Sequence, residues 1–216
     1  QKTAYEIVSR DWSSDVCSSD LASKLAAYQP SLVHVHNWFP TFTPSIYDAC
    51  ISKKIPIVQT LHNYRIFCAS GLLARDGKPC ELCLGGNTLP ALRYACYQDS
   101  RASTYALTRM IQFHRRQNTW NTKVDAFIAL SDFSAGKLAE GGVDRAKIHV
   151  KPNFAFAPSP ENPRRPEGYA LYVGRISKEK GISTLIDAWE GMQIPLWIVG
   201  DGELRHSLKN KNPLIR

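Results

Sequence analysis

The sequence lacks any long hydrophobic run, and this absence argues against a protein that spans a membrane. A helix that spans a membrane needs about 18 or more consecutive apolar residues, and no such run occurs in the 216 residues. The first ten residues, QKTAYEIVSR, also lack the order of charged and then apolar residues that a secretory signal has. We therefore expect a cytoplasmic protein, with peripheral contact to a membrane as a second expectation.

Acidic residues are also fewer than basic residues. There are 19 Asp and Glu against 27 Lys and Arg, which gives a formal net charge of +8. Such an excess favours anionic partners, whether phosphate groups, nucleic acid or a lipid surface, but it does not indicate a fold.

Short β-rich runs alternate with segments of helical spacing along most of the chain. The expected strands are 31–36, 55–62, 124–130, 146–153, 169–174 and 194–200, and the expected helices are 22–29, 44–54, 89–120, 131–142 and 181–192. This alternation is typical of parallel sheets covered by helices, so we predict an α/β fold.

Two segments stand apart from this alternation. Residues 156–167 are rich in proline and poor in apolar side chains, which predicts a linker between a first domain, 22–155, and a second, 168–216. The second domain has only two expected strands, which are too few to bury a core, so we interpret it as incomplete. We interpret the first domain as incomplete as well.

The segment DWSSDVCSSDL (Asp11–Leu21) fits no helix or strand period and resembles a translated sequencing-library adapter. We interpret residues 1–21 as a non-native segment.

A pair of cations in the second domain follows the end of an expected strand. Arg175 comes directly after Gly174, and Lys180 with Gly181 opens the next helix. Ligands of open α/β sheets bind beyond the carboxyl ends of the strands, where a helix N-terminus also favours anions. A forked guanidinium and a mobile ammonium there suit a diphosphate. The alternative is two solvated charges beside a turn.

Several stretches together resemble one known family. VGRISKEKGISTLIDAW followed by PLWIVGDGEL resembles the donor site of glycosyltransferase family 4, whose members are retaining enzymes with the GT-B fold of two Rossmann-like domains. PSLVHVHNWFPTFTPSI, IPIVQTLHNYRIFC, DAFIALSDFSAGKLAEGGV and KIHVKPNF resemble its N-terminal domain, in the same order. The resemblance implies transfer of a sugar from a nucleotide-sugar donor to a glycan or lipid-linked acceptor, without a catalytic cofactor and without nucleic acid as a partner.

The resemblance also assigns roles to residues. It implies that His62 is the catalytic histidine that faces the transferred sugar, and that Gly174, Arg175, Lys180 and Gly181 hold the donor diphosphate. Gly200 and Gly202 form the turn near the donor base, and His36, Asn37 and Asn63 contribute to the acceptor side of the cleft. Asn63 stands where many relatives have Asp. The family's paired glutamates and glycine-rich loop do not occur in the printed sequence, so we expect this chain by itself to be inactive.

Four cysteines form a separate pattern inside the first domain. Cys68, Cys80, Cys83 and Cys96 have the spacing C-x11-C-x2-C-x12-C within a Cys-rich insertion, 68–96. The C-x2-C pair is typical of a structural zinc site, and the outer pair would complete four thiolate ligands. Free buried thiols and two disulfides are the alternatives.

Two competing functions follow from the cysteines and the charge. A zinc-containing nucleic-acid-binding module would use both, but the segment from Cys68 to Asn87 contains no aromatic residue for base stacking. A non-catalytic scaffold is the other competitor. The basic stretch 101–123, with apolar residues between its cations, is interpreted either as a solvated helix face or as a surface that lies against anionic lipid.

Overall fold

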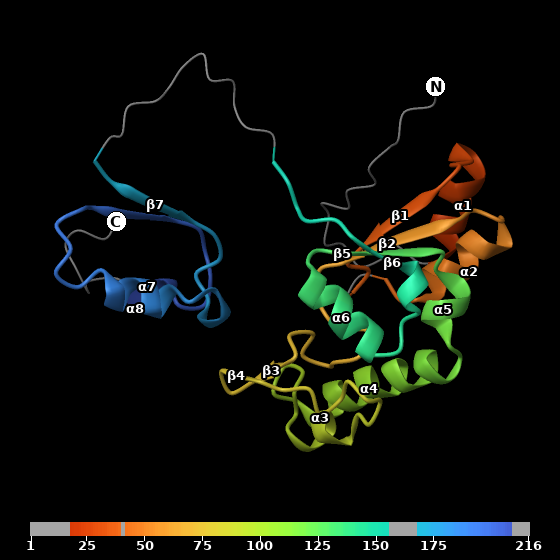
Figure 1. Ribbon diagram of the computed structural model, residues 1–216, viewed down its shortest axis with the longest axis horizontal. Coiled ribbons are helices and arrows are strands. Elements are labelled where there is room, and N and C mark those ends of the chain that lie inside the picture. The colour runs from red at the N-terminus through yellow and green to blue at the C-terminus, as the bar shows by residue number, and fades with distance from the viewer. Residues whose placement is uncertain (1–17, 40–41, 156–167, 209–216) are drawn as a thin grey trace, which may run out of the picture. The chain divides into compact units, whose positions relative to one another are not determined.

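The computed structural model describes residues 18–39, 42–155 and 168–208 and divides the chain into two compact units (Figure 1). Unit 1 comprises residues 1–155 and unit 2 comprises residues 156–216. The division falls at the start of the proline-rich segment 156–167, which lies outside the described residues, as do residues 1–17 of the adapter-like N-terminus. Within the described residues, no helix is both long enough and apolar enough to cross a membrane.

Unit 1 is built on a four-stranded parallel sheet. In spatial order its strands are β1 (Val33–His36), β2 (Ile57–Leu61), β5 (Ala126–Ala129) and β6 (Ile148–Val150). The helices that accompany them are α1 (Ser18–Tyr28), α2 (Ser45–Ser52) and α6 (Asp132–Glu140), with a short 3-10 turn, η1 (Arg145–Lys147), before β6. Parallel neighbours need crossover connections of this kind. The predicted α/β class is therefore confirmed.

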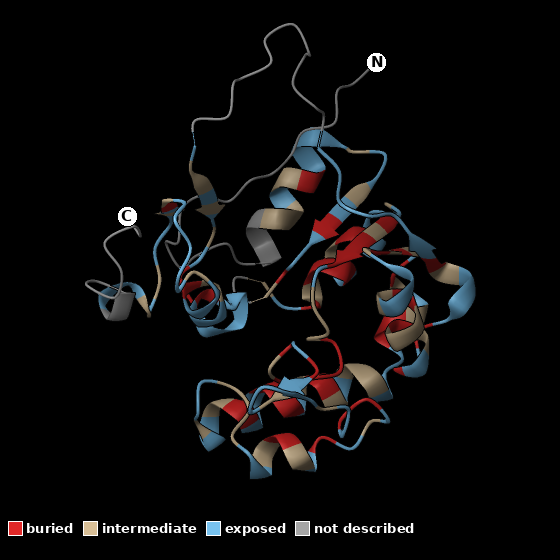
Figure 2. Cartoon of the chain, turned by 60° about the vertical axis from the view of Figure 1, so that its left-hand side comes forward, coloured by how far each residue is buried: buried red, intermediate tan, exposed pale blue. Residues whose placement is uncertain are grey.

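The core of unit 1 lies around the central strands of this sheet. Ile57 and Leu61 of β2 are buried beside Phe127 of β5. The polar side chain of Gln59 is buried with them and accepts a hydrogen bond from the hydroxyl of Tyr47. Figure 2 shows the buried residues concentrated in the strands and in a second group within the Cys-rich part of the unit. Burial of both sheet faces explains why β2 has no alternation of apolar and polar residues.

The first helix begins earlier than the sequence predicts. We expected helical structure from Ala22, but α1 already begins at Ser18, inside the segment that resembles an adapter. Leu21, the last residue of that segment, is partly buried against the core. The predicted boundary at Ala22 is therefore not a boundary of the helix.

The expected helix over 89–120 is wrong, because the structure has three helices there. They are α3 (Leu89–Arg93), α4 (Arg101–Arg116) and α5 (Thr119–Lys123), and a small hairpin of β3 (Ala74–Arg75) and β4 (Lys78–Pro79) precedes them. Ala95, Gln98 and Asp99 have positive φ angles, which no helix accommodates. The side chain of Ser100 then caps α4 by accepting a hydrogen bond from the backbone N–H of Ser103 at 3.2 Å.

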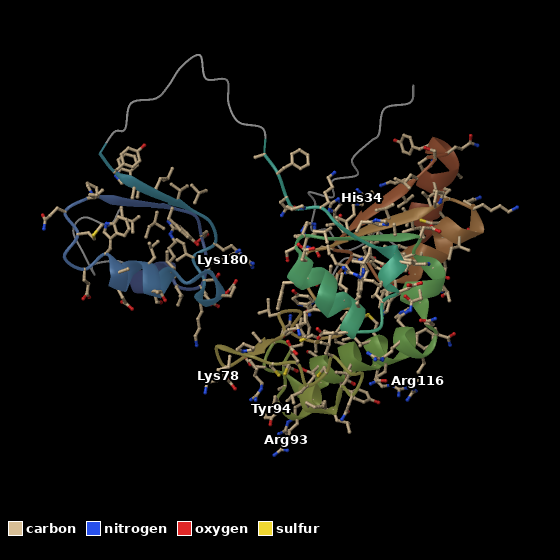
Figure 3. The ribbon with its side chains drawn as sticks, in the orientation of Figure 1. His34, Lys78, Arg93, Tyr94, Arg116 and Lys180 are labelled. Atoms are coloured by element: carbon tan, nitrogen blue, oxygen red, sulfur yellow. The ribbon has the colours of Figure 1, made fainter. Side chains whose placement is uncertain are left out.

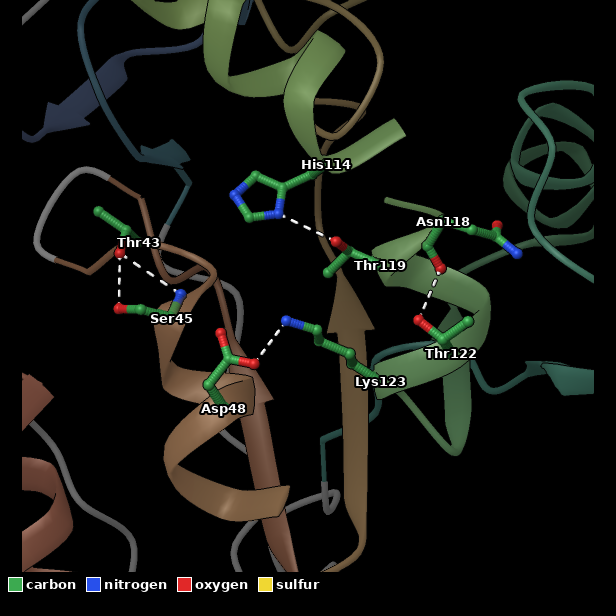
Figure 4. A network of polar contacts seen from close by, with 8 residues as sticks. All are labelled: Thr43, Ser45, Asp48, His114, Asn118, Thr119, Thr122 and Lys123. Atoms are coloured by element: carbon green, nitrogen blue, oxygen red, sulfur yellow. Dashed lines mark hydrogen bonds and ion pairs between the residues drawn. The ribbon is translucent and has the colours of Figure 1, made fainter. Parts of the chain in front are cut away.

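Polar contacts fasten α5 to its neighbours (Figure 4). Lys123 Nζ lies 2.5 Å from Asp48 Oδ1 of α2, and His114 Nδ1 lies 3.0 Å from Thr119 Oγ1. Between these contacts the indole of Trp120 is buried and stacks on Trp38 with ring centroids 6.4 Å apart. The end of α4 and all of α5 are thereby joined to α2 and to the loop after β1.

Unit 2 is a smaller α/β arrangement. Its parallel strands are β7 (Ala170–Val173) and β8 (Leu196–Val199), followed respectively by η2 (Lys178–Lys180) with α7 (Ile182–Ala188), and by α8 (Arg205–Leu208). Ile176, Ile182 and Ile186 form its core together with partly buried side chains of both strands. Among the described residues nothing covers the other sheet face, where Val173 is 69% and Leu171 is 55% exposed.

Replacement of Gly141 tests how the end of α6 packs in unit 1. A Cβ atom at Gly141 would lie 2.4 Å from Cε2 of the buried Phe67 ring, which is closer than packing permits. We expect Gly141→Ala to lower the free energy of unfolding by about 1–3 kcal/mol, the usual cost of overpacking. Denaturant unfolding of the full chain measures the change.

Gly136 provides the matched control, because it lies inside the same helix and a Cβ there meets no atom within 4 Å. Gly136→Ala should stabilise the protein by about 0.5–1 kcal/mol, the ordinary gain from replacing a helical glycine. Equal effects of the two substitutions would contradict the predicted clash with Phe67.

Candidate active site

The carboxyl ends of β1 and β2 bring two His-Asn dipeptides together in unit 1. The strands are parallel with His36 aligned to Thr60, so the residues that follow each strand lie side by side. His36 Nδ1 lies 2.9 Å from His62 Nε2, and Asn63 Nδ2 donates a hydrogen bond to Asn37 Oδ1 at 3.1 Å. In both pairs the partners are 26 positions apart. The four unit 1 residues expected at the site therefore form one connected group.

A third histidine, His34, extends this group along β1. Its Nε2 lies 2.8 Å from Thr60 Oγ1, and its ring centroid lies 4.2 Å from that of His36. The sequence analysis assigned His36 to the cleft and did not include His34. The signal for His34 was nevertheless present in the sequence, because alternate residues of a strand point to the same face. The structure thus forms a row of three imidazoles at the end of the sheet.

The surroundings of His62 and His34 favour the neutral form of both imidazoles. Burial lowers the pKa of His62 below its usual value, and the charge of His36 lowers it further. Burial likewise lowers the pKa of His34, with smaller contributions from the charges of His36, Lys151 and His62. A neutral imidazole can donate one hydrogen bond and accept another. At neutral pH His62 can therefore bind a hydroxyl group without placing a positive charge beside it.

The Asn63 amide makes two contacts that need different atoms. Its Oδ1 accepts a hydrogen bond from the backbone N–H of Arg65 at 3.0 Å, while its Nδ2 donates to Asn37. An aspartate at this position could keep the contact with Arg65 but could not donate to Asn37. The asparagine therefore joins the start of the following loop to the end of β1.

Arg65 anchors that loop. Its guanidinium donates to the carbonyl oxygens of Ala69 at 2.5 Å and Ser70 at 3.1 Å, and it lies over the rings of Phe39 and Tyr97 at 4.6 and 5.3 Å from their centroids. The sequence analysis did not single out this residue. Its contacts join the entry of the Cys-rich insertion to the end of β1 and to the turn before α4.

In unit 2 two loops approach each other through glycines. Gly200 follows β8, and a Cβ there would lie 1.9 Å from the carbonyl oxygen of Gly174, which follows β7. A Cβ at Gly202 would lie 2.3 Å from the carbonyl oxygen of Ile176. The loops are also hydrogen-bonded to each other, from Ile176 N to Asp201 O at 2.9 Å. Only residues without a side chain permit this close approach.

The two predicted cations of unit 2 act on one carboxylate. Arg175 Nη2 lies 3.5 Å from Glu179 Oε1. The neighbouring side chain of Ser177 is the largest cause that lowers the pKa of the Glu179 carboxyl, and the charges of Arg175 and Lys180 lower it further. Gly181, at the start of α7, has a φ of +67°, which favours glycine where the chain turns from η2 into the helix. Sequence reasoning missed Glu179, although its i, i+4 spacing from Arg175 is a signal for an ion pair.

The four cysteines of the insertion lie close enough to influence one another electrostatically. Burial raises the pKa of Cys83 to about 11, and the charges of Cys68, Cys96 and Cys80 contribute to the rise. All four are free thiols, so the disulfide alternative is not what the structure has. In the described part of the chain, no group of three or more His, Cys, Asp or Glu residues has an arrangement that could hold a metal ion. The geometry therefore does not fit the zinc site, which stays a prediction of the sequence alone.

Metal analysis distinguishes the two remaining states of these cysteines. The structure predicts a protein without bound zinc, in which Cys83 reacts with iodoacetamide at pH 8 more slowly than free cysteine because little of it is thiolate. Elemental analysis and mass-spectrometric alkylation mapping measure both quantities. About one zinc per chain, lost in Cys83→Ser, would instead establish the four-thiolate site.

Comparison with known proteins assigns unit 1 to a family. Residues 9–155 match Glycosyltransferase Family 4, and this range includes the adapter-like Asp11–Leu21. The chain belongs to this family. One solved structure similar to the chain is that of HepE from Anabaena in complex with UDP, with 16% sequence identity and a TM-score of 0.46. The similarity covers 88% of this chain but 44% of HepE, so the chain spans less than half of that protein. No curated protein matches the sequence.

As a family 4 chain, the protein has its predicted site residues in two groups. His36, Asn37, His62 and Asn63 belong to the matched range and are in mutual contact. Arg175, Lys180 and the glycines belong to unit 2, outside that range. The membership favours the glycosyltransferase hypothesis over the zinc-containing nucleic-acid module.

Proposed function

We propose that the protein takes part in the transfer of a sugar from a nucleotide-sugar donor to a glycan or lipid-linked acceptor, with retention of configuration. The observation that carries this proposal is the common carboxylate of Arg175 and Lys180 beside the glycine-lined ends of β7 and β8. Membership in glycosyltransferase family 4 supports the reaction class. The two-domain GT-B arrangement is part of the same proposal.

The donor diphosphate would take the place that the Glu179 carboxylate has beside the cations. A guanidinium can donate to two oxygens of a diphosphate, and an ammonium adds a mobile charge. Gly200 and Gly202 leave the backbone free of side chains at the ends of the strands, where ligands of open α/β sheets bind. The same proposal has these protein groups bind the donor without a catalytic cofactor.

His62 would contact the transferred sugar. During transfer the bond between the anomeric carbon and the leaving phosphate oxygen breaks, and positive charge develops on the sugar ring. The acceptor oxygen forms the new bond, and its proton passes to the leaving phosphate. A neutral imidazole can hydrogen-bond a sugar hydroxyl without opposing that charge, and the lowered pKa keeps His62 in this form. Orientation and electrostatic stabilisation would supply most of the rate.

The pH dependence of His62 tests this part of the proposal. In His36→Asn a neutral side chain replaces a neighbour whose charge lowers the pKa of His62, so the pKa of His62 should rise. Burial still holds it below the usual value of 6.5. Because the folded state binds this proton less readily than the unfolded state, stability should fall as the pH drops through 6.5, and the variant should lose less. NMR titration and unfolding at several pH values measure both effects.

The exposed His149 of β6 gives the control for that titration. His149→Asn should leave the titration of His62 unchanged. An unchanged or lower pKa of His62 in His36→Asn would contradict electrostatic coupling between the two rings.

Replacement of Arg175 tests the donor site. A charge-assisted hydrogen bond contributes roughly 1.5–3 kcal/mol, so Arg175→Ala should weaken binding of a nucleoside diphosphate at least tenfold. Isothermal titration of the chain with UDP, GDP and ADP measures the dissociation constants and shows which base is preferred.

Lys53→Ala is the control, because Lys53 is an exposed cation at the end of α2 in unit 1. It should bind the nucleotides as the parent chain does. Equal affinities of the parent and Arg175→Ala would reject the diphosphate role. A parent chain that binds none of the three nucleotides would favour the non-catalytic scaffold.

A further inference from the structure

The outer face of α4 carries an unusual set of side chains. Thr104, Leu107, Thr108 and Ile111 form its buried face. The opposite face exposes arginines and aromatic rings in turn, at the spacing that places residues on one side of a helix: Arg101, Tyr105, Arg109, Phe113 and Arg116. Tyr105 is 54% and Phe113 is 57% exposed. The helix contains no acidic residue. We call these five residues the α4 outer face.

An apolar pocket adjoins this face. It has a volume of about 720 Å³, and Arg101 belongs to both the pocket and the α4 outer face. Its apolar wall includes Leu82 and Leu89, which are 54% and 70% exposed, and Arg93 lies at the pocket together with Arg101. Aliphatic side chains and arginines are therefore exposed together over α3 and the start of α4.

Positive charge is concentrated in this part of unit 1. Residues 64–117 contain eight Lys or Arg and three Asp or Glu, a surplus of five out of the total of +8, in a quarter of the chain. Figure 3 shows Lys78, Arg93 and Arg116 extending from the side of this segment that faces away from the four-stranded sheet. Among the described residues, no carboxylate forms an ion pair with Arg93, Arg101, Arg109 or Arg116.

We propose that the α4 outer face and the adjoining pocket dock on the surface of a bilayer that contains anionic phospholipid. Arginines can keep their charged groups among lipid phosphates while their stems cover apolar surface. Tyr105 is amphipathic and Phe113 is apolar, and side chains of both kinds enter the interface between water and lipid. The pocket leucines would contact the acyl chains. The surplus of positive charge complements anionic headgroups.

The aliphatic pocket favours lipid over nucleic acid as the partner. Single-stranded nucleic acid is bound by aromatic faces on which bases stack, within a basic groove. Tyr94 also lines the pocket, but the guanidinium groups of Arg75 and Arg93 lie 3.8 and 5.7 Å from its ring centroid, where a base would have to stack. Leu82, Leu89 and the other aliphatic residues of the pocket offer no stacking surface, but they match acyl chains. The proposal concerns unit 1 alone and does not depend on donor binding in unit 2.

Co-sedimentation with vesicles tests the proposal. The full chain should bind phosphatidylcholine vesicles that contain phosphatidylglycerol, and binding should weaken as salt is added because exposed charges are screened. Arg101→Gln combined with Arg109→Gln should weaken partitioning by about fivefold for each cation removed. Leu89→Ser combined with Phe113→Ser should also weaken it, because both side chains are largely exposed and their loss removes only apolar contact with the bilayer.

Lys53→Gln combined with Arg145→Gln removes the same charge from other exposed positions of unit 1 and should leave binding unchanged. Circular dichroism checks that every variant is folded, and titration with UDP reports separately on unit 2. Absence of vesicle binding, equal binding to pure phosphatidylcholine, or equal losses in the control would overturn the proposal. Binding of an oligothymidine in place of vesicles would identify this surface as a nucleic-acid site instead.

Discussion

The parallel alignment of β1 with β2 is the constraint on which the unit 1 site depends. Because His36 is aligned with Thr60, the residues after both strands leave the sheet at the same edge. The His36–His62 and Asn37–Asn63 contacts follow directly from that alignment. A shift by one residue would place every side chain of the strand on the opposite face and would separate both pairs. The buried side chains of β2 oppose such a shift, because Gln59 would lose the hydrogen bond that it accepts from Tyr47.

Unit 2 uses the same principle with different chemistry. Its two strands also end side by side, but glycines follow them where unit 1 has imidazoles and amides. The backbones of the two loops approach closely there, and the charges of Arg175 and Lys180 both act on the carboxylate of Glu179. In unit 1 the strand ends supply hydrogen-bonding groups of low charge, and in unit 2 they supply positive charge.

The long connection between β2 and β5 adds a basic and apolar surface to unit 1. It contains the cysteines, α3 and α4, and its own small core of Ala69, Cys83, Ala91, Leu107 and Ile111. Arg65 and the contacts of α5 join it at both ends to the sheet and to α2. Residues 64–117 of this connection carry five of the eight net positive charges of the chain, while the imidazole row lies at the strand ends. One unit can therefore present a basic apolar surface without placing that charge on the histidines.

The sequence by itself determined the alternation of strands and helices outside the segment between β2 and β5, because apolar spacing is a local property. The resemblance to family 4 pointed to His36, Asn37, His62 and Asn63, which the structure brings into contact as two pairs. It could not predict the break between α3 and α4, which depends on left-handed residues that no local pattern requires. Only the tertiary structure decided that His34 joins the imidazole row, that Glu179 pairs with Arg175, and that no disulfide joins the described cysteines. These outcomes depend on distances between segments far apart in the chain, and such distances are set by packing rather than by spacing along the sequence.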